Sequence, residues 1–297
     1  MPRICDYEGS RYRTDFWEGQ NRTYEDRTER AAMRKLLPSQ GKRLIEIGAG
    51  FGRLADLYQG YHQVVLLDYA RTQLEQARDL LGHDDRFIYV VADVYKLPFV
   101  DDVFDAVTMV RVMHHLVEVP MALQELHRII APTGTAVIEH ASKSHLKAII
   151  RWLLRRQPWS PFDPTPTEFV DLNFNFHPAW MRQQFELAGF CIQKTRALSY
   201  YRLDLLKRLL PTPLLVTLDE WTQPTGNWWQ LAPSLFLQAG VDKPESSPSD
   251  EFFRCPICKS PELVRLGLKS GDTSLTCQGC QRRWSYSGGI YDFKTSL

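Results

Sequence analysis

A short run of glycines after an apolar segment constrains this chain more than any other feature. Residues 44–52 read L-I-E-I-G-A-G-F-G, a strand-like stretch that runs into three closely spaced glycines. Only glycine lets a backbone turn this tightly from strand to helix and come into contact with a ligand. The next two strand-like runs end on Asp68 and Asp93, and acidic residues at such positions suit ribose hydroxyls. Together these features predict a nucleotide-type cofactor site.

The nearest alternative is a dinucleotide-binding domain, whose fingerprint is G-x-G-x-x-G. The chain departs from it, because Gly48, Gly50 and Gly52 give G-x-G-x-G and Arg53 stands where the third glycine is needed. Glu46 lies two residues ahead of the first glycine, inside the strand. The pattern E-x-G-x-G-x-G, followed by V-V-L-L-D and V-V-A-D-V, resembles the class I S-adenosylmethionine-dependent methyltransferases.

This resemblance implies roles for individual residues. The glycine loop would wrap the amino-acid part of S-adenosylmethionine and Glu46 would orient that loop. Asp68 would bind the ribose hydroxyls and Asp93 the adenine edge, since carboxylates accept hydrogen bonds from hydroxyls and amines. The alternative is that both aspartates only cap the following helices. The implied cofactor-binding residues are Glu46, Gly48, Ala49, Gly50, Gly52, Asp68, Tyr69, Asp93, Val94 and Val110.

Strand-like and helical segments alternate from residue 43 to residue 139, which predicts a parallel sheet. The strand-like runs are 43–47, 63–68, 87–93, 104–110 and 135–139, with helices that include 70–81 and 120–130. Farther on we expect a helix at 177–188 and strands at 190–198 and 233–238. The resemblance covers about residues 40–240. It implies an α/β fold with a doubly wound, mostly parallel sheet of seven strands whose last strand is antiparallel.

Two further runs narrow the resemblance. V-A-D-V-Y-K-L-P-F (91–99) and F-D-A-V-T-M-V-R-V-M-H-H-L (104–116) are similar to the group that includes the quinone-biosynthesis C-methyltransferases and many small-molecule methyltransferases. Enzymes that methylate the exocyclic amines of bases usually carry an N-P-P-Y-type tetrapeptide after the fourth strand. This chain has V-R-V-M at 110–113, which disfavours methylation of base nitrogens.

His114 and His115 follow the fourth strand, at the edge where open parallel sheets bind ligands. Histidine titrates near neutrality, so either could accept a proton from an attacking hydroxyl or carbon acid. His140 is another candidate. The alternative is that these imidazoles are structural or contact the cofactor, because in-line methyl transfer needs only the positioning of the reactants.

Segments 141–176 and 199–229 interrupt the alternation and carry most of the tryptophans, so we expect them to roof the active site. Residues 146–154 and 203–210 combine leucines with lysines and arginines. Such helices pack on their own domain, lie on a membrane surface or touch RNA phosphates, and we expect ordinary packing here. The aromatic N-terminal stretch, within residues 1–40, forms either a lid over the cofactor or a helix on the sheet edge.

A second small domain follows a polar, proline-broken linker at 241–251. Residues 252–297 contain two C-x-x-C pairs separated by 18 residues: Cys255 with Cys258, and Cys277 with Cys280. Four thiolates suit a tetrahedral structural zinc with no open position for catalysis. Disulfides are the alternative use, but a cytosolic chain has no oxidising compartment to keep them.

The C-terminal run resembles the small zinc-ribbon proteins that bind and activate methyltransferases as separate subunits. Here the ribbon is tethered in cis, so we expect it to dock on its own catalytic domain, residues 1–240, at a raised effective concentration. A ribbon can also grip RNA, but its basic residues are few and scattered.

The chain has 297 residues and a formal net charge of +1, which gives no global attraction to nucleic acid or acidic membranes. It shows no secretory signal and no membrane span, so we expect a cytoplasmic protein. The function predicted is an enzyme that moves a methyl group from S-adenosylmethionine to an oxygen or carbon of a small, apolar acceptor. RNA methylation and a noncatalytic module that binds the cofactor or RNA remain the alternatives.

Overall fold

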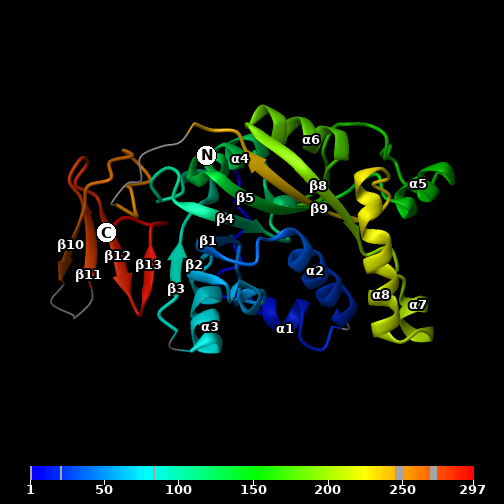
Figure 1. The fold of residues 1–297 in the computed structure, drawn as a ribbon, viewed down its shortest axis with the longest axis horizontal. Helices are drawn as coiled ribbons and strands as arrows, with labels where there is room; N and C mark the ends of the chain where they lie inside the picture. The colour runs from blue at the N-terminus through cyan, green and yellow to red at the C-terminus, as the bar shows by residue number, and fades with distance from the viewer. Residues whose placement is uncertain (1, 21, 83, 245–250, 268–272) are drawn as a thin grey trace.

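A central sheet of seven strands organises the computed structural model (Figure 1), which describes residues 2–20, 22–82, 84–244, 251–267 and 273–297. Its strand order is β3-β2-β1-β4-β5-β9-β8. The first five strands are parallel, and β9 is antiparallel to both of its neighbours. The predicted fold class is therefore confirmed. The strands are β1 (Gly41–Ile47), β2 (Tyr61–Asp68), β3 (Phe87–Val91), β4 (Phe104–Met109), β5 (Ile130–Ala141), β8 (Phe190–Leu198) and β9 (Ser234–Val241).

Helices cover both faces of this sheet. On one face lie α2 (Thr23–Leu36) and α3 (Arg71–Leu81), and on the other lie α4 (Val119–Ile129) and α6 (Pro178–Leu187), as Figure 1 shows. The apolar residues of β1 alternate accordingly, because successive side chains of a strand point to opposite faces. Leu44 packs in the cluster that contains Leu74 of α3, whereas Ile45 packs in the cluster that contains Leu126 of α4.

The fifth strand starts earlier than the sequence predicts. It was expected at 135–139, but β5 begins at Ile130 and runs through Pro132 and Gly134. Phe104 pairs with Ile130 and Ala106 with Thr135, so four residues of β5 lie between two pairs that a single residue separates on β4. Pro132 has no N–H to donate to a neighbouring strand, which suits this irregular stretch.

The C-terminal cysteine-rich segment extends the sheet. Its strands β10 (Leu263–Gly267), β11 (Thr273–Cys277), β12 (Arg283–Ser287) and β13 (Ile290–Asp292) form an antiparallel meander. β13 then pairs in parallel with β3, so that the sheet continues to eleven strands (Figure 1). Phe253 forms a further bridge with Phe99, on the loop after β3. The sequence did not indicate this pairing.

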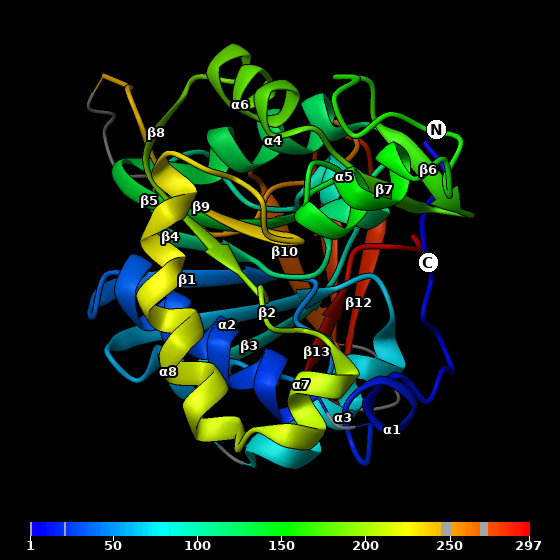
Figure 2. The same cartoon turned by 90° about the vertical axis from the view of Figure 1, so that its right-hand side faces the viewer.

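Most of the remaining elements lie toward the opposite end of the sheet, whereas α1 lies between α2 and α3 (Figure 1). Figure 2 shows α5, α7 and α8 from that end. In the parts of the chain that the structure describes, no helix is both long enough and apolar enough to cross a bilayer. The remaining helices and strands of the domain are α1 (Tyr12–Phe16), α5 (Leu146–Leu153), β6 (Thr167–Val170), β7 (Asn173–Asn175), α7 (Asp204–Leu209) and α8 (Thr212–Thr222).

The aromatic contact between Phe253 and Phe99 generates a stability prediction. Phe253 packs on Phe99, Tyr291 and Phe293 with ring centroids 4.7 to 5.6 Å apart. Phe253→Ala should therefore lower the free energy of unfolding by about 3 kcal/mol, measured by chemical denaturation. As a control, Phe162→Ala removes a ring that is 55% exposed and should change it by less than about 0.5 kcal/mol. Equal effects of the two variants would contradict this account of the contact.

Candidate cofactor and acceptor site

Four parallel strands end at one edge of the sheet, and the residues that follow them line a common cavity. Gly48 follows β1, Asp68 ends β2, Asp93 follows β3 and Val110 follows β4. All four line a cavity of about 110 Å³. The strand order reverses direction between β1 and β4, which is the position where open α/β sheets bind ligands.

The loop after β1 requires its glycines. Gly48, Gly50 and Gly52 have φ angles of +69°, +55° and +76°, in the left-handed region that other residues rarely adopt. A Cβ atom at Gly48 would lie 2.1 Å from Cγ2 of Val112. Gly50 differs, because a Cβ atom there would meet little: among the described residues, only the Tyr12 ring would lie within 4 Å of it.

Asp68 ties this loop to the next one. Its Oδ2 accepts a hydrogen bond from the Gly50 N–H at 2.8 Å, and its Oδ1 accepts one from the Ala70 N–H at 2.9 Å. Burial raises the pKa of Asp68, and these two backbone bonds oppose that rise. Each carboxylate oxygen has a second lone pair, so Asp68 can still accept hydrogen bonds from a ligand.

Asp93 has one role that the sequence left open. Its Oδ1 accepts a hydrogen bond from the Tyr95 N–H at 2.9 Å and so caps the short 3₁₀ helix Val94–Lys96. Burial raises the pKa of this carboxyl as well. The cap uses a single oxygen and Asp93 still lines the cavity, so capping and ligand binding are compatible here.

The residues predicted to bind a cofactor divide into three groups. Most line the 110 Å³ cavity: Gly48, Gly50, Asp68, Tyr69, Asp93, Val94 and Val110. Glu46 and Ala49 line a smaller adjoining cavity of about 30 Å³ together with Gly48, Gly50 and Val110. Gly52 is among the described lining residues of neither, and a Cβ there would lie 3.2 Å from Leu81. Its place therefore reflects close packing of the loop on α3.

Glu46 carries a buried oxygen that lacks a partner. Its Oε2 makes no hydrogen bond with any described residue, although the side chain is almost fully buried. Burial is the main cause that raises the pKa of Glu46 to about 8. A buried polar atom without a partner is costly, and Glu46 faces the small cavity beside the glycine loop. This arrangement suits a ligand that brings a cationic donor, such as the ammonium group of an amino acid.

A second cavity of about 680 Å³ adjoins the first. Four side chains line both cavities and so form the wall between them: Tyr7, Tyr12, Arg111 and His115. The larger cavity is lined by five basic side chains, Arg22, Arg111, Lys147, Arg151 and Arg202, and by one acidic residue, Glu139. Its interior therefore favours a ligand group that is electron-rich or anionic.

His115 stands in this wall with a defined tautomer. Its Nδ1 lies 2.8 Å from the carbonyl oxygen of Leu172, which can only accept, so Nδ1 carries the proton. Nε2 is then free to accept and lies 3.2 Å from the Tyr7 hydroxyl. Burial lowers the pKa of His115 below its usual value. The ring is therefore neutral at pH 7 and presents a proton acceptor.

The other two histidines differ from His115. His114 lines the larger cavity but is not among the described residues that line the smaller one. The centroids of the His114 and His115 rings are 4.0 Å apart. Burial, assisted by the nearby His115 and Arg111, holds the pKa of His114 well below its usual value. His140 packs against Phe176 and is not among the described residues that line either cavity. Its candidacy as a base finds no support in this geometry.

The N-terminal segment supplies wall residues that the sequence patterns did not identify individually. Glu8 accepts hydrogen bonds from the N–H groups of Arg71 and Thr72, at the first turn of α3. This anchor holds Tyr7 and Tyr12 against the cavity. Their aromatic character was the available signal, because the residues that anchor this segment, Arg71 and Thr72, lie more than sixty residues away in the chain.

Arg111 is the other unforeseen wall residue. It has a φ angle of +60°, in the left-handed region. Its N–H donates to Oε2 of Glu139 at 2.9 Å, and its guanidinium pairs with the buried carboxylate of Glu29 on α2. These two carboxylates hold a strained backbone in place, which is typical of functional sites.

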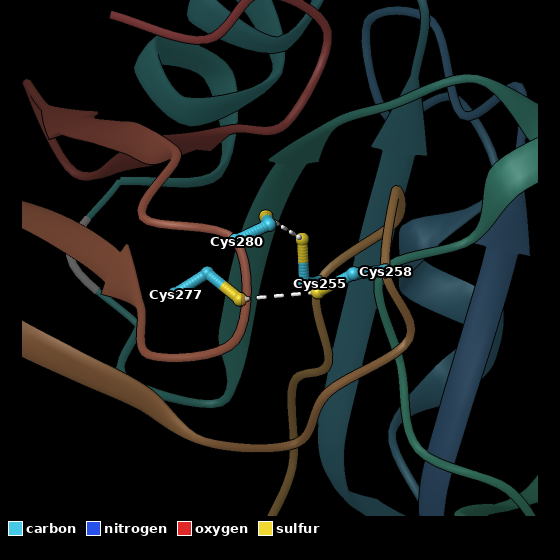
Figure 3. A group of neighbouring side chains, drawn as sticks. All are labelled: Cys255, Cys258, Cys277 and Cys280. Carbon is cyan, nitrogen blue, oxygen red and sulfur yellow. Dashed lines mark hydrogen bonds between the residues drawn. The ribbon is translucent and has the colours of Figure 1, made fainter.

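The four cysteines of the C-terminal segment come together (Figure 3). The sulfurs of Cys255, Cys258, Cys277 and Cys280 all lie within 4.8 Å of one another. Zn–S bonds of about 2.3 Å in a tetrahedron place sulfurs roughly 3.8 Å apart. The sulfurs of Cys258 and Cys277 are 3.3 Å apart, and those of Cys255 and Cys280 are 3.7 Å apart. The cluster fits a structural zinc held by two turns of the chain.

Comparison with known proteins shows what this domain resembles. Residues 45–138 match the family described as "Methyltransferase domain". The sheet shares its fold with solved S-adenosylmethionine-dependent methyltransferases. The resemblance inferred from the glycine loop is thereby confirmed.

Sequence relatives match the first part of this domain. A demethylmenaquinone methyltransferase from Clavibacter sepedonicus is 39% identical over 109 residues, which cover 36% of this chain and 44% of that protein. A ubiquinone/menaquinone biosynthesis C-methyltransferase from Paracoccus denitrificans is 29% identical over 133 residues, covering 42% and 52%. The chain thus spans about half the length of the curated relatives that it matches.

Solved structures agree with the fold over a longer span. One is from the complex between the Haloferax volcanii Trm112 methyltransferase activator and a methyltransferase. It aligns with a TM-score of 0.53 at 19% identity and covers 80% of this chain and 99% of that one. An S-adenosylmethionine-dependent methyltransferase from Thermotoga maritima aligns with a TM-score of 0.54 at 16% identity, covering 77% and 94%.

The cysteine cluster generates a prediction about metal removal. Cys258→Ser should release zinc and lower the melting temperature, because the metal supplies most of the folding free energy of so small a segment. Zinc content by elemental analysis and thermal unfolding would measure both effects. Cys191→Ser is the matched control, since Cys191 is exposed and outside the cluster. Full zinc content in Cys258→Ser would contradict the assignment of the site.

Proposed function

We propose that this chain transfers a methyl group from S-adenosylmethionine to an oxygen or carbon of a small, largely apolar acceptor. One observation carries the proposal: the two cavities meet at a wall of only four shared side chains, Tyr7, Tyr12, Arg111 and His115. A donor in one cavity and an acceptor in the other would face each other across that wall. Such proximity is the main requirement of in-line transfer.

The first cavity supplies the binding groups for the donor. Asp68 and Asp93 would accept hydrogen bonds from the ribose hydroxyls and the adenine amine, and Glu46 would pair with the ammonium group of the amino-acid part. When bound, S-adenosylmethionine supplies a methyl group made electrophilic by the adjacent sulfonium. Tyr69 and Val94 line the same cavity and offer apolar surface beside the purine.

The second cavity supplies the groups that would activate the acceptor. His115 Nε2 would take the proton that a hydroxyl or carbon acid loses during transfer, after the Tyr7 hydroxyl yields its place. The neighbouring basic side chains lower the pKa of an acidic acceptor and stabilise its anion. His114, beside His115, has a lowered pKa and would remain neutral.

We further propose that the zinc ribbon supports the donor site within the same chain. β13 pairs with β3, and Asp93 follows β3 by two residues. The Phe293 N–H donates to the Val91 carbonyl at 2.8 Å. The Lys294 ammonium donates to the backbone carbonyl of Tyr69 at 3.3 Å and lies 3.9 Å from the centre of the Tyr69 ring. Lys294 also pairs with Asp6 of the N-terminal segment at 2.8 Å.

Methyl transfer itself can be tested directly. Purified protein and S-adenosylmethionine with a labelled methyl group would be incubated with lipid-soluble and water-soluble fractions of a cell extract. The proposal expects label in a small molecule, absent from boiled protein. Label found only in RNA would overturn the small-acceptor assignment, and no label in any fraction would argue for a noncatalytic module.

Asp68 provides a prediction for donor binding. Asp68→Ala removes two backbone hydrogen bonds of the loop and the acceptor for the ribose, so the affinity for S-adenosylmethionine should fall about a hundredfold. Isothermal titration calorimetry would measure it. Asp84→Ala, just before β3 and not among the described residues that line the cavity, is the control and should bind normally. Unchanged affinity in Asp68→Ala would remove this residue from the site.

His115 provides a prediction for the acceptor step. His115→Gln should lower turnover by roughly a hundredfold while leaving the affinity for S-adenosylmethionine nearly unchanged. Because the pKa of His115 is lowered, the wild-type rate should stay constant as pH falls to 6.5 and decline only below it, where the ring becomes protonated. The variant should lack this acidic decline. An identical pH profile in both proteins would exclude His115 as the base.

A further inference from the structure

Helix α5 presents its apolar side to solvent, not to the domain. Of its eight residues only Ala148 is buried. Leu146, Ile150 and Leu153 are 54%, 47% and 65% exposed, and Leu154, directly after the helix, is 57% exposed. Positions three and four apart share one helix face, so these side chains form a single outward stripe. The ordinary packing expected from the sequence is therefore not what the structure shows.

Helix α7 and the loop at 228–231 carry further exposed apolar side chains. Helix α7 has no buried residue, and its Leu205 and Leu209 are 66% and 68% exposed. Leu231, whose carbonyl accepts a hydrogen bond from the Leu146 N–H, lines a groove with Trp228 and Trp229. Both tryptophans are more than 70% exposed. In Figure 2 helices α5, α7 and α8 all lie on the side that faces the viewer, with α5 in the upper part of the view and α7 and α8 in the lower part.

The charge of α5 and its continuation is entirely positive. Lys147, Arg151, Arg155 and Arg156 are all exposed, and residues 141–160 contain no aspartate or glutamate. None of these four side chains forms an ion pair with any carboxylate that the structure describes. Lys147 directly follows Leu146 and Arg151 directly follows Ile150, which places both cations on the flank of the apolar stripe. A surface of this kind is complementary to anions beside a hydrocarbon layer.

We propose that this face, formed by α5, α7 and the loop at 228–231, docks on an anionic lipid bilayer. Exposed leucines would enter the boundary between headgroups and acyl chains, while lysines and arginines would contact acidic headgroups. The tryptophans suit that boundary because an indole is apolar with one polar N–H. A second copy of the chain fits this face less well, since a two-fold contact would oppose four unpaired cations to four others.

Residues of this face also line the larger cavity. Leu146, Lys147 and Arg151 of α5 line that cavity, as do Arg202 and Leu203 just before α7. A docked molecule would therefore turn the cavity toward the bilayer, and an apolar acceptor could enter it without crossing water. This route of entry rests on the proposed methyl transfer, whereas the docking itself does not.

Vesicle flotation tests the docking without any need for activity. The full chain should float with phosphatidylglycerol vesicles and much less with phosphatidylcholine vesicles. Ile150→Asp combined with Leu153→Asp should weaken the binding at least about tenfold. Arg155→Glu with Arg156→Glu should weaken it about fivefold for each charge removed, and this loss should shrink at high salt. None of these four residues lines the 680 Å³ cavity.

A matched control separates docking from general surface polarity. Leu80→Asp replaces a leucine of α3 that is 51% exposed and lies away from this face, and it should float like the wild type. Unchanged thermal unfolding and S-adenosylmethionine affinity would show that each variant is folded. The proposal is overturned if the wild type does not float with anionic vesicles, or if the variant with Ile150→Asp and Leu153→Asp floats like the wild type. It is also overturned if this double variant abolishes self-association or RNA binding instead of vesicle binding.

Discussion

The left-handed turn after β1 is the constraint on which the rest of the site depends. β1 is an interior strand of the sheet, paired with β2 on one side and β4 on the other. The chain must leave it between two loops that are already close, and Gly48 passes Val112 with no room for a Cβ atom. Because the turn is so tight, the Gly50 N–H reaches Asp68 and the ends of four strands open onto one cavity.

Buried charges then fix the wall between the two cavities. Glu29 of α2 is buried and pairs with both Arg53 and Arg111, and together these arginines hold the pKa of Glu29 below its usual value against the cost of burial. The Trp17 ring lies 3.9 Å from the Arg53 guanidinium and 5.0 Å from that of Arg111. The glycine loop, the helix before it and the loop after β4 are thereby joined through one carboxylate.

The sequence predicted those parts of the site whose signals are local. Gly48, Asp68 and Asp93 were found because each stands at a strand end, where a short pattern and its chemistry coincide. The cysteine pairs were found for the same reason. Tyr7 and Arg111 were missed as wall residues because their places depend on contacts with distant segments. Gly52 was assigned to the cofactor, but its packing against Leu81 depends on the position of α3, which no pattern in the loop records.

The pairing of β13 with β3 has a consequence for how the chain is made. A ribosome releases residues in order, so β3 emerges nearly two hundred residues before its outer neighbour. Until then its backbone groups on that side have no partner, and such a bare margin invites other strands to pair with it. Residues 290–292 close this margin when β13 pairs with β3. The sheet is therefore completed only after the ribbon has been made.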